Sequence, residues 1–409
     1  MTIEHSKSVN NIEQANTFDI VISGGGLSGC LMALSLCNIR NAKGEKLSIA
    51  IVEANKAEQG QSKSFDDRVL ALSHGTAHYL KQLNVWPLLQ KDAQPIEKIH
   101  ISDREHYGKA RLEAKNHKVE ALGYVVEMSL IGQALHSKLA QQNNITWFTP
   151  DSIENIQWQQ SQVNITLNSG ETVVTSLLLG CDGVNSPCRS FAKIESRTMA
   201  YGQSALITNI ATLNKHQNVA YERFTENGPI AMLPLSNNRC SLVWTLTPEL
   251  AEKMQELNDA DFKLALEQAF GSWLGTVTQV GRRAVYPLNL VEANTQVYHR
   301  MALVGNASHT IHPIAGQGFN LGVRDVQQLA GLIESALKKS QDIGNFSLLN
   351  QYQQDRSKDQ KQVINLTDSL VTLFSNQLPP LVIGRNVGLK VLNYLTPLKN
   401  ALVNKTMGY

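Results

Sequence analysis

A glycine-rich turn between a short apolar strand and a helix constrains this chain more than any other feature. The expected strand covers residues 18–23, Gly24, Gly26 and Gly29 follow in the pattern G-x-G-x-x-G, and an Ala/Leu-rich helix is expected from about 30 to 39. The first glycine permits the tight turn, the second lets a pyrophosphate approach the backbone, and the third lets the helix pack close to the strand. Because the first helical turn has free N–H groups, this segment predicts a phosphate-binding unit.

A second strand and an acidic residue complete the unit. Residues 47–52 are expected to form a strand that ends at Glu53, which lies 24 residues after Gly29. A carboxylate at this place can bond the hydroxyl groups of a ribose. Because the same carboxylate disfavours a 2'-phosphate, the unit predicts FAD or NAD as the resident nucleotide rather than NADP.

Two further glycine-containing stretches follow expected strands later in the chain. Residues 180–189 read G-C-D-G-V-N-S-P-C-R. Residues 304–325 read V-G-N-A-S-H-T-I-H-P-I-A-G-Q-G-F-N-L-G-V-R-D, with three glycines around an expected helix start. The Asp-Gly pair of the first stretch alone indicates only a turn. The backbone N–H groups of the second can lie against an anionic group or a developing negative charge.

The middle of the chain has a different pattern. Strand-like segments succeed one another between residues 205 and 247, which indicates an antiparallel sheet inserted into an α/β frame. A helix is expected over 79–89, closed by Pro87, and the chain is expected to be mostly helical from residue 326 onward. The other expected strands are 163–167, 172–179, 205–210, 220–224, 230–235, 240–246 and 301–304.

The composition excludes several classes of protein. The 409 residues are 42% hydrophobic and 18% charged, which is typical of a globular protein with a large core. The 37 basic and 35 acidic residues leave a net charge of +2 without any basic block, so no nucleic acid is expected as a partner. The five cysteines form no C-x-x-C pair, which argues against a disulfide framework and a zinc site. Cys30 and Cys37 are expected to be small buried residues in a reducing compartment.

The two ends of the chain give expectations about where in the cell the protein acts. Residues 1–17 are polar and lack the apolar core of a signal peptide, and no run of 18 apolar residues occurs. We therefore expect a cytoplasmic protein. An amphipathic stretch over 370–403 either docks on a membrane surface or a partner protein, or packs on the protein's own core.

Together, the three glycine-containing stretches resemble the motifs of the flavin-dependent aromatic hydroxylases of the para-hydroxybenzoate hydroxylase fold. These motifs are G-x-G-x-x-G, D-G-x-x-S-x-x-R and G-D-A-x-H-x-x-x-P-x-x-G-Q-G-x-N, and the likeness runs from about residue 18 to 408. Within the family, the chain is most similar to the ubiquinone-biosynthesis hydroxylases, through residues 228–235, 239–244, 286–288 and 312–322.

One position departs from the family motif. Asn306 stands where the family usually has an aspartate, and this asparagine is typical of the methoxyphenol hydroxylase branch. An amide can still bond a ribityl hydroxyl, although without charge assistance, so flavin binding is expected to survive.

The resemblance implies an α/β fold with a Rossmann-like FAD-binding domain of the glutathione-reductase type. This domain is interleaved with an antiparallel-sheet substrate domain and followed by a C-terminal helical segment. The implied divisions are an FAD-binding domain at 18–75, 105–190 and 285–345, a substrate domain at 76–104 and 191–284, a C-terminal helical segment at 346–409 and a polar tail at 1–17.

The resemblance also assigns residues to the parts of FAD. The first turn and Glu53 would hold the ADP half, Asp182 and Gly183 would lie near the pyrophosphate and the path of the pyridine nucleotide, and Asn306 would hold the ribityl chain. The residues implied to bind FAD are Gly24, Gly26, Leu27, Ser28, Gly29, Glu53, Arg68, Glu127, Asp182, Gly183, Asn306, Pro313, Gly316, Gln317, Gly318 and Asn320.

Two of these assignments are less specific. Arg68 matches a family arginine near the flavin, but an ion pair with Asp66 or Asp67 explains it as well. Glu127 matches a polar FAD contact only loosely. No side chain is assigned as a general base, although Pro313 and Gly316 are implied to lie beside the flavin ring.

The implied chemistry is a monooxygenation. NAD(P)H reduces FAD, O2 adds at flavin C4a, and the hydroperoxide transfers one oxygen atom to an electron-rich phenol. The substrate implied by the closest resemblance is a polyprenyl phenol of ubiquinone biosynthesis, and other proteins of that pathway are possible partners. Four residues of the antiparallel sheet fit either an apolar roof over the flavin or an ordinary sheet core: Phe224, Met232, Leu233 and Trp244.

Three alternatives fit part of the sequence. A flavin halogenase would be expected to carry W-x-W, which the five tryptophans never form. An NAD-dependent dehydrogenase would explain the first motif but not the second or third. A non-catalytic flavoprotein subunit would show no flavin reduction by NAD(P)H. A metal at His309 and His312 is not expected, because no carboxylate or thiol neighbours complete a site.

Overall fold

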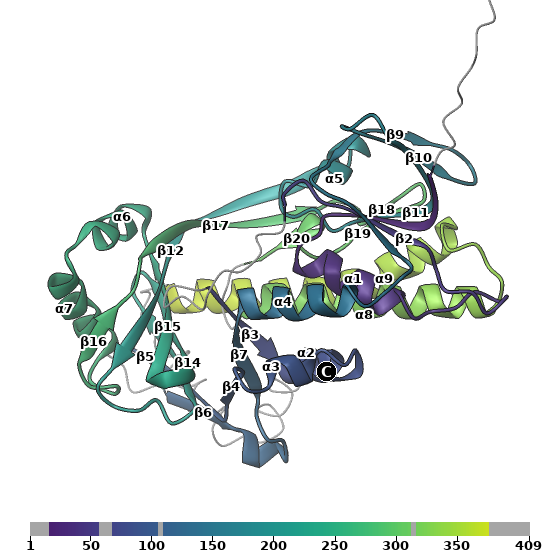
Figure 1. The fold of residues 1–409 in the computed structure, drawn as a ribbon. Coiled ribbons are helices and arrows are strands. Elements are labelled where there is room, and N and C mark those ends of the chain that lie inside the picture. Colours follow the sequence, from purple (N-terminus) through teal and green to yellow (C-terminus); the bar gives the residue numbers. More distant parts are fainter. Residues whose placement is uncertain (1–15, 57–67, 105–108, 312–315, 376–409) are drawn as a thin grey trace, which may run out of the picture.

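The computed structural model describes residues 16–56, 68–104, 109–311 and 316–375. Within these ranges the chain forms three β-sheets and the helices that cover them (Figure 1). No helix in the described part of the chain is both long and apolar enough to cross a membrane. The amphipathic stretch expected over 370–403 lies largely outside the described residues.

An eight-stranded sheet carries the first glycine turn. Its strands are β1 (Asn16–Ser23), β2 (Ile49–Val52), β8 (Ile145–Phe148), β9 (Ile153–Trp158), β10 (Val163–Leu167), β11 (Thr172–Gly180), β18 (Val297–Tyr298) and β19 (Met301–Leu303). The five strands in the order β19-β11-β1-β2-β8 are all parallel, while β18 and the β9–β10 hairpin are antiparallel additions. Both faces of β1 are covered, since Ile20, Val21 and Ile22 are fully buried. This explains the unbroken apolar run in the sequence.

Helices cover this parallel sheet. They are α1 (Leu27–Leu36), α2 (His74–Gln82), α3 (Trp86–Leu89), α4 (Met128–Leu139), α5 (Pro187–Phe191), α8 (Gln317–Lys338) and α9 (Phe346–Ser375). Helix α1 contacts both α4 and α8, and α8 packs along α9. Tyr352 of α9 is fully buried and donates a hydrogen bond to the carbonyl oxygen of Leu303, 3.0 Å away. The start of the C-terminal helical segment is therefore part of the core around the parallel sheet.

A nine-stranded sheet forms the second layer. Its strands are β5 (Lys98–Asp103), β6 (Lys109–Glu113), β12 (Ser196–Thr212), β13 (Val219–Thr225), β14 (Gly228–Leu235), β15 (Arg239–Leu246), β16 (Val277–Val280), β17 (Ala284–Ala293) and β20 (His309–Thr310). The order is β20-β17-β12-β15-β14-β13-β5-β6, with β16 added to β12. Figure 1 shows β12 and β17 as a long two-stranded ribbon between the two layers. One face of the sheet packs on α6 (Pro248–Glu256) and α7 (Asp259–Phe270).

A small third sheet lies between the two layers. Its strands are β3 (Val69–Ser73), β4 (Gln94–Ile96) and β7 (Gly123–Glu127), in the order β3-β7-β4. The described residues also form short 3-10 helices, namely η1 (Ala114–His117), η2 (Ser236–Asn238) and η3 (Gly305–Ala307). Strands β4 and β7 contact β14, which joins the small sheet to the nine-stranded sheet.

Three expectations about the layers are wrong. Strands β6 and β17 were expected in the FAD-binding domain but pair within the nine-stranded sheet. Helices α2 and α3 were expected in the substrate domain but pack in the core of the parallel sheet, through residues such as Leu80 and Trp86. The helix expected over 79–89 is two helices, because Asn84 takes a left-handed conformation between them, and Pro87 stands in the first turn of α3 rather than at a helix end.

Candidate functional site

The three glycine-containing turns meet at one edge of the parallel sheet. They follow the last residues of β1, β11 and β19, which are adjacent parallel strands. Ser23 pairs with Gly180 at the ends of β1 and β11, and Gly180 pairs with Leu303 at the end of β19. The carboxyl ends of parallel strands form the usual ligand-binding edge of such a sheet. The sequence alone did not bring these three turns together.

The first turn can be built only with glycine at two positions. Gly24 has a φ angle of +98°, and a Cβ atom there would lie 2.6 Å from the carbonyl oxygen of Cys181. A Cβ atom at Gly29 would lie 1.9 Å from the carbonyl oxygen of Gly24. The first contact holds the turn against the second motif, and the second lets α1 start directly behind the turn.

The start of α1 is suited to a pyrophosphate. Gly26 is the N-cap of α1, no side chain caps the helix, and no acidic residue lies in its first turn. A Cβ atom at Gly26 would meet no other atom within 4 Å, so the space beside this helix start is open. Free N–H groups beside open space favour a bound phosphate, and this observation fits the ADP half of FAD. Leu27 and Ser28 belong to the same helical turn.

Glu53 follows β2 next to this turn. Its carboxylate accepts hydrogen bonds from the backbone N–H of Gly25 at 2.6 Å and from that of Asn55 at 2.9 Å. The oxygen bonded to Asn55 also accepts from the side-chain amide of Asn55 at 3.2 Å, so it is fully used. The oxygen bonded to Gly25 has a further lone pair, to which a ribose hydroxyl group can still donate. The position of Glu53 is therefore compatible with the predicted ribose contact.

The second motif is a linker between the other two. The Asp182 carboxylate accepts hydrogen bonds from the N–H of Cys188 at 2.9 Å and from the hydroxyl of Ser23 at 3.4 Å. Gly183 has a φ angle of +82°. Arg189 donates to the carbonyl oxygen of Ala307 in the third motif, 2.9 Å away. Asp182 thus lies beside the first turn, as expected, and its shown contacts fasten the start of α5.

The third motif places Asn306 at the surface of the site. Asn306 is exposed, and its side chain has no hydrogen-bond partner among the described residues. The preceding Gly305 is close to the first motif, since a Cβ atom there would lie 3.0 Å from the Ser28 hydroxyl. An exposed amide beside the start of α1 is free for the predicted contact with the ribityl chain. Pro313 and His312 lie outside the described residues.

The start of α8 is fixed to β3. Gly316 is the N-cap of α8 with a φ angle of +61°, and the side chain of Asn320 holds it in place. The Asn320 amide donates to the carbonyl oxygens of Ala71 and Gly316 at 2.8 and 2.7 Å and accepts from the N–H of Ser73 at 2.8 Å. Asn320 is 2% exposed and its side-chain amide is used within the protein, so the predicted flavin contact would fall to its backbone.

The neighbouring residues remain candidates for the flavin ring. Gln317 is buried and Gly318 is partly buried in the first turn of α8. Among the described residues, no side chain caps this helix start. The positive end of the helix dipole can stabilise negative charge on a reduced flavin by about 0.3–2 kcal/mol.

A buried charge network is hydrogen-bonded to two residues of the third motif, Gly305 and His309. Asp325 of α8 is fully buried and accepts from His309 at 2.8 Å, from the Gly305 N–H at 3.1 Å and from Arg356 of α9 at 2.6 Å. Burial alone would raise the pKa of Asp325, but His309 and Arg356 outweigh it and bring the pKa down to about 2. Gln360 of α9 adds a further hydrogen bond at 3.0 Å. The sequence analysis missed this network, whose members are up to 55 positions apart.

Arg68 and Glu127 lie together at the edge of the small sheet. Val69 pairs with Glu127, and the carbonyl oxygen of Arg68 accepts from the Met128 N–H at 2.8 Å. The Arg68 side chain is exposed, while Asp66 and Asp67 lie outside the described residues. Glu127 is 5% exposed and pairs with Arg239 of β15 at 2.8 Å. Its other carboxylate oxygen is buried without a partner in the described part of the chain, so only that oxygen is left for the predicted FAD contact.

The four predicted pocket residues lie on two different faces of the nine-stranded sheet. Met232 and Trp244 pack in the core formed with α6 and α7, which we call the outer face. Phe224 and Leu233 occupy the alternate positions of the same strands and therefore point to the other side. We call this side the inner face. The prediction is thus wrong for Met232 and Trp244, which are ordinary core residues.

The inner face is turned toward the small sheet and the start of α8. Ala220 and Leu233 on this face pack with Ile96 and Val125 of the small sheet. The small sheet in turn holds the N-cap of α8, since a Cβ atom at Gly316 would lie 2.8 Å from that of Ala71. Several residues of the inner face are only partly buried, among them Ile207, Glu222, Ala231, Leu233 and Val243. An apolar surface thus adjoins the predicted flavin site.

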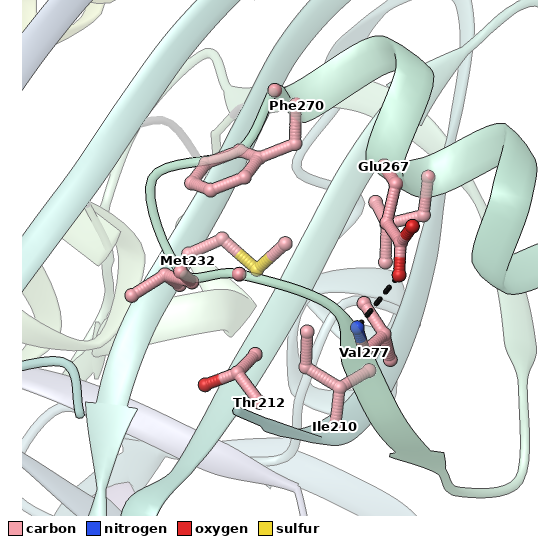
Figure 2. Close-up of a pocket in the computed structure, with 10 residues that line it drawn as sticks. Ile210, Thr212, Met232, Glu267, Phe270 and Val277 are labelled. Atoms are coloured by element: carbon pink, nitrogen blue, oxygen red, sulfur yellow. Dashed lines mark hydrogen bonds between the residues drawn. The ribbon is translucent and has the colours of Figure 1, made fainter. Parts of the chain in front are cut away.

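The pocket in Figure 2 lies on the outer face, in the core formed with α6 and α7. It is a gap beneath α7, lined mainly by apolar side chains such as Ile210, Met232 and Phe270. Glu267 closes one side by accepting a hydrogen bond from the Val277 N–H at 2.7 Å (Figure 2). The cavity is separated from the glycine turns by the sheet itself.

The five cysteines form no disulfide bond with one another. All five cysteines are free and buried, as expected for Cys30 and Cys37. Among the described residues, no group of three or more His, Cys, Asp or Glu side chains is arranged to hold a metal ion.

The fold and the three converging turns define a dinucleotide-binding protein with a second, mainly antiparallel sheet. The family comparison agrees, because the profile of the FAD-binding domain family matches residues 17–367. The chain belongs to this family and, within it, to the FAD-dependent hydroxylases of ubiquinone biosynthesis. It is an aromatic-ring monooxygenase with FAD as its cofactor, and NAD(P)H and O2 are the typical co-substrates of this class.

Two relatives carry this assignment. The chain is 35% identical to a ubiquinone hydroxylase, UbiL, from Rhodospirillum rubrum, over 95% of this chain and 89% of that protein. It is 32% identical to the 3-demethoxyubiquinol 3-hydroxylase of Escherichia coli, over 95% of this chain and 98% of that protein. A solved structure confirms the fold: p-nitrophenol 4-monooxygenase PnpA from Pseudomonas putida superposes with a TM-score of 0.76 at 17% identity, covering 96% of this chain and 99% of that chain.

Proposed function

We propose that this chain hydroxylates a ring carbon of a polyprenyl phenol, converting 2-polyprenyl-6-methoxyphenol to the corresponding hydroquinone in ubiquinone biosynthesis. The observation that carries the proposal is the partly buried apolar inner face beside the start of α8. A lipophilic ring with an apolar tail suits such a surface, because its burial gains about 25 cal/mol for each Å² removed from water.

Different residues of the chain would bind FAD, stabilise charge and orient the substrate. The start of α1, Glu53 and Asn306 bind the two ends of FAD, which when bound supplies the activation of O2. The uncapped start of α8 stabilises negative charge near the flavin ring. The inner face orients the phenol and excludes water from the reacting atoms.

A second candidate is hydroxylation at another carbon of the same ring. The E. coli relative is named a 3-demethoxyubiquinol 3-hydroxylase, which supports hydroxylation at that ring position as the alternative. Asn306 favours the methoxyphenol reaction, because it is typical of that branch of the family.

A lipid profile of a strain that lacks this protein tests the proposal. Loss of ubiquinone with accumulation of polyprenyl-methoxyphenol, reversed by the intact gene, is the expected result in mass spectrometry. Accumulation of an earlier or later ring intermediate would move the enzyme to another carbon. Unchanged ubiquinone, in a strain with no second hydroxylase, would refute the role in this pathway.

We also propose that the protein acts in the cytoplasm at the membrane surface, where a polyprenyl phenol is dissolved. Contact with the membrane or with other ubiquinone-biosynthesis proteins is assigned to the amphipathic stretch 370–403. Co-sedimentation with vesicles, compared between the full chain and a chain ending at residue 375, tests this assignment.

A further inference from the structure

Glu222 is an ionisable side chain on the inner face that no part of the fold uses. It lies in β13, where it pairs with Ala231 of β14 and with Ile101 of β5. The next positions across the sheet are Val243 and Ile207, so the whole row around the carboxyl group is apolar. No hydrogen bond or ion pair joins this carboxyl group to another described residue.

An isolated carboxylate in apolar surroundings is costly, so its presence calls for a reason. Burial raises the pKa of Glu222 from 4.5 to about 7. The Glu222 side chain is only partly buried, so its carboxyl group can be reached from the inner face. Ionisable groups with perturbed pKa values concentrate at functional sites. Because the apolar row offers Glu222 no partner, a ligand on the inner face is the natural one.

The place of Glu222 in the sheet agrees with this reading. Ala220, two residues earlier on the same face, packs against the small sheet that holds the start of α8. Glu222 lies about 7 Å further along the strand, since each residue of a strand rises about 3.4 Å. Helix α9 contacts β13 and β14 (Figure 1). Because α6 and α7 cover the outer face, α9 closes the inner side.

Few charged groups face Glu222 from the elements around it. On β5 the same face carries Asp103, which has an interaction of its own. On β15 it carries Arg239, which is paired with Glu127. On α9, Asp368 accepts a hydrogen bond from Tyr201 at 2.6 Å. Among the described residues, none of these groups offers Glu222 a cation.

We propose that the Glu222 carboxylate accepts the phenolic proton of the substrate. The phenol O–H bond breaks, the proton passes to a carboxylate oxygen of Glu222, and the electron pair stays on the phenolate oxygen. The phenolate ring is more electron-rich than the phenol ring and is therefore a better acceptor of the oxygen atom. After release of the product, Glu222 returns the proton to water. This inference rests on the proposed function, because it assumes a phenol as substrate.

The experiment compares wild type, Glu222→Gln and the control Glu226→Gln, which removes the same charge from an exposed position four residues away. Two phenols serve as probes: 2-methoxyphenol with a short 6-prenyl chain, and a ring-fluorinated analogue that is already ionised at pH 7.5. FAD content, the rate of flavin reduction by NADH and by NADPH, and hydroxylated product are measured from pH 6 to 9.

The expected result separates a proton acceptor from a structural residue. Glu222→Gln should bind FAD normally and lose product formation from the first phenol by about 100-fold or more, the size of general-base effects. It should recover most of the wild-type rate with the ionised analogue. The wild-type rate should fall below about pH 7, and the variant should lack this inflection.

Other outcomes would overturn the inference. A wild-type rate in Glu222→Gln with the first phenol would show that the carboxylate is not needed. An equal loss with both phenols would show a structural role only. If wild type converts neither phenol although NAD(P)H reduces its FAD, the phenol substrate of the proposed function is refuted.

Discussion

Removing the Glu222 carboxylate should stabilise the folded protein, and the gain should depend on pH. The pKa of Glu222 is raised from 4.5 to about 7 by burial. One pKa unit corresponds to about 1.4 kcal/mol, so ionising Glu222 costs the folded state at most about 3 kcal/mol relative to the unfolded chain. Solvent reaches part of the side chain, and screening makes this an upper bound.

The sign follows from the direction of the shift. Below pH 4.5 the carboxyl group is protonated in both states, and wild type and Glu222→Gln should be equally stable. As the pH rises from 4.5 to 7, the unfolded state ionises first, and the wild-type protein loses stability that the variant retains. Above about pH 7 both states are ionised, and the difference should become constant.

Thermal unfolding of the two proteins at pH 5 and pH 8 measures this difference. The entropy of unfolding is about 2.1 cal/mol/K per residue, so about 3 kcal/mol corresponds to a shift in Tm of about 4 °C for 409 residues. We expect Glu222→Gln to melt up to about 4 °C higher than wild type at pH 8 and within about 1 °C at pH 5. Glu226→Gln should match wild type at both values. A variant that is less stable than wild type at pH 8 would refute the reasoning, because it would mean that the carboxylate has a stabilising partner.

Three further predictions concern the cofactor side. Gly26→Ala places its Cβ in open space, so this variant should fold normally. Its FAD affinity in a fluorescence titration should fall at least about 10-fold, the equivalent of about 1.4 kcal/mol. In Gly29→Ala the Cβ would lie 1.9 Å from a backbone oxygen, so this variant should give little folded protein on gel filtration. Asp325→Asn should lower the free energy of unfolding by about 3–5 kcal/mol, because Arg356 loses its buried partner and keeps only Asp359. The wild-type contribution should be nearly complete above about pH 4, should decline as the pH falls below the ordinary aspartate pKa of 3.8, and should be largely lost at about pH 2. Arg239→Ala should lower Tm, and adding Glu127→Gln should recover part of the loss, since the second change removes the buried charge left behind.

The sequence predicted the glycine turn and the strands beside it well, because short stretches of sequence determine most of their structure. The glycine at position 29 is required by a backbone contact with Gly24, five positions earlier, and the strands on either side follow from short apolar runs. The contact of Gly24 with Cys181 is not local and could not be derived in this way. The meeting of the three turns was not derivable from spacing, because it depends on the order of the parallel strands. Resemblance supplied that order, and the structure agrees with it.

The errors have physical reasons as well. Both faces of β14 are apolar, so alternation alone could not tell that Met232 faces α6 and α7. In β15 the polar residues Arg239 and Ser241 alternate with an apolar row that includes Trp244, but the pattern does not say which elements cover that row. The motif likeness placed Asn320 at the flavin, but its amide is satisfied by the backbone of β3 and of the α8 start. The pair of Arg239 with Glu127 joins residues 112 positions apart, a distance at which the sequence gives no pairing signal.

The buried network around Asp325 explains why the C-terminal helix belongs to the cofactor site. Asp325 holds the third turn through the Gly305 N–H and His309, and its charge is balanced by Arg356 from α9. A buried carboxylate that has lost such a cation is strongly destabilising, so the turn can keep its shape only while α9 is docked. Farther along, the same helix contacts β13 and β14 and is bonded to β12 through Asp368 and Tyr201. One helix therefore links the turn that carries Asn306 to the sheet that carries Glu222, and a displacement of α9 would disturb both halves of the site together.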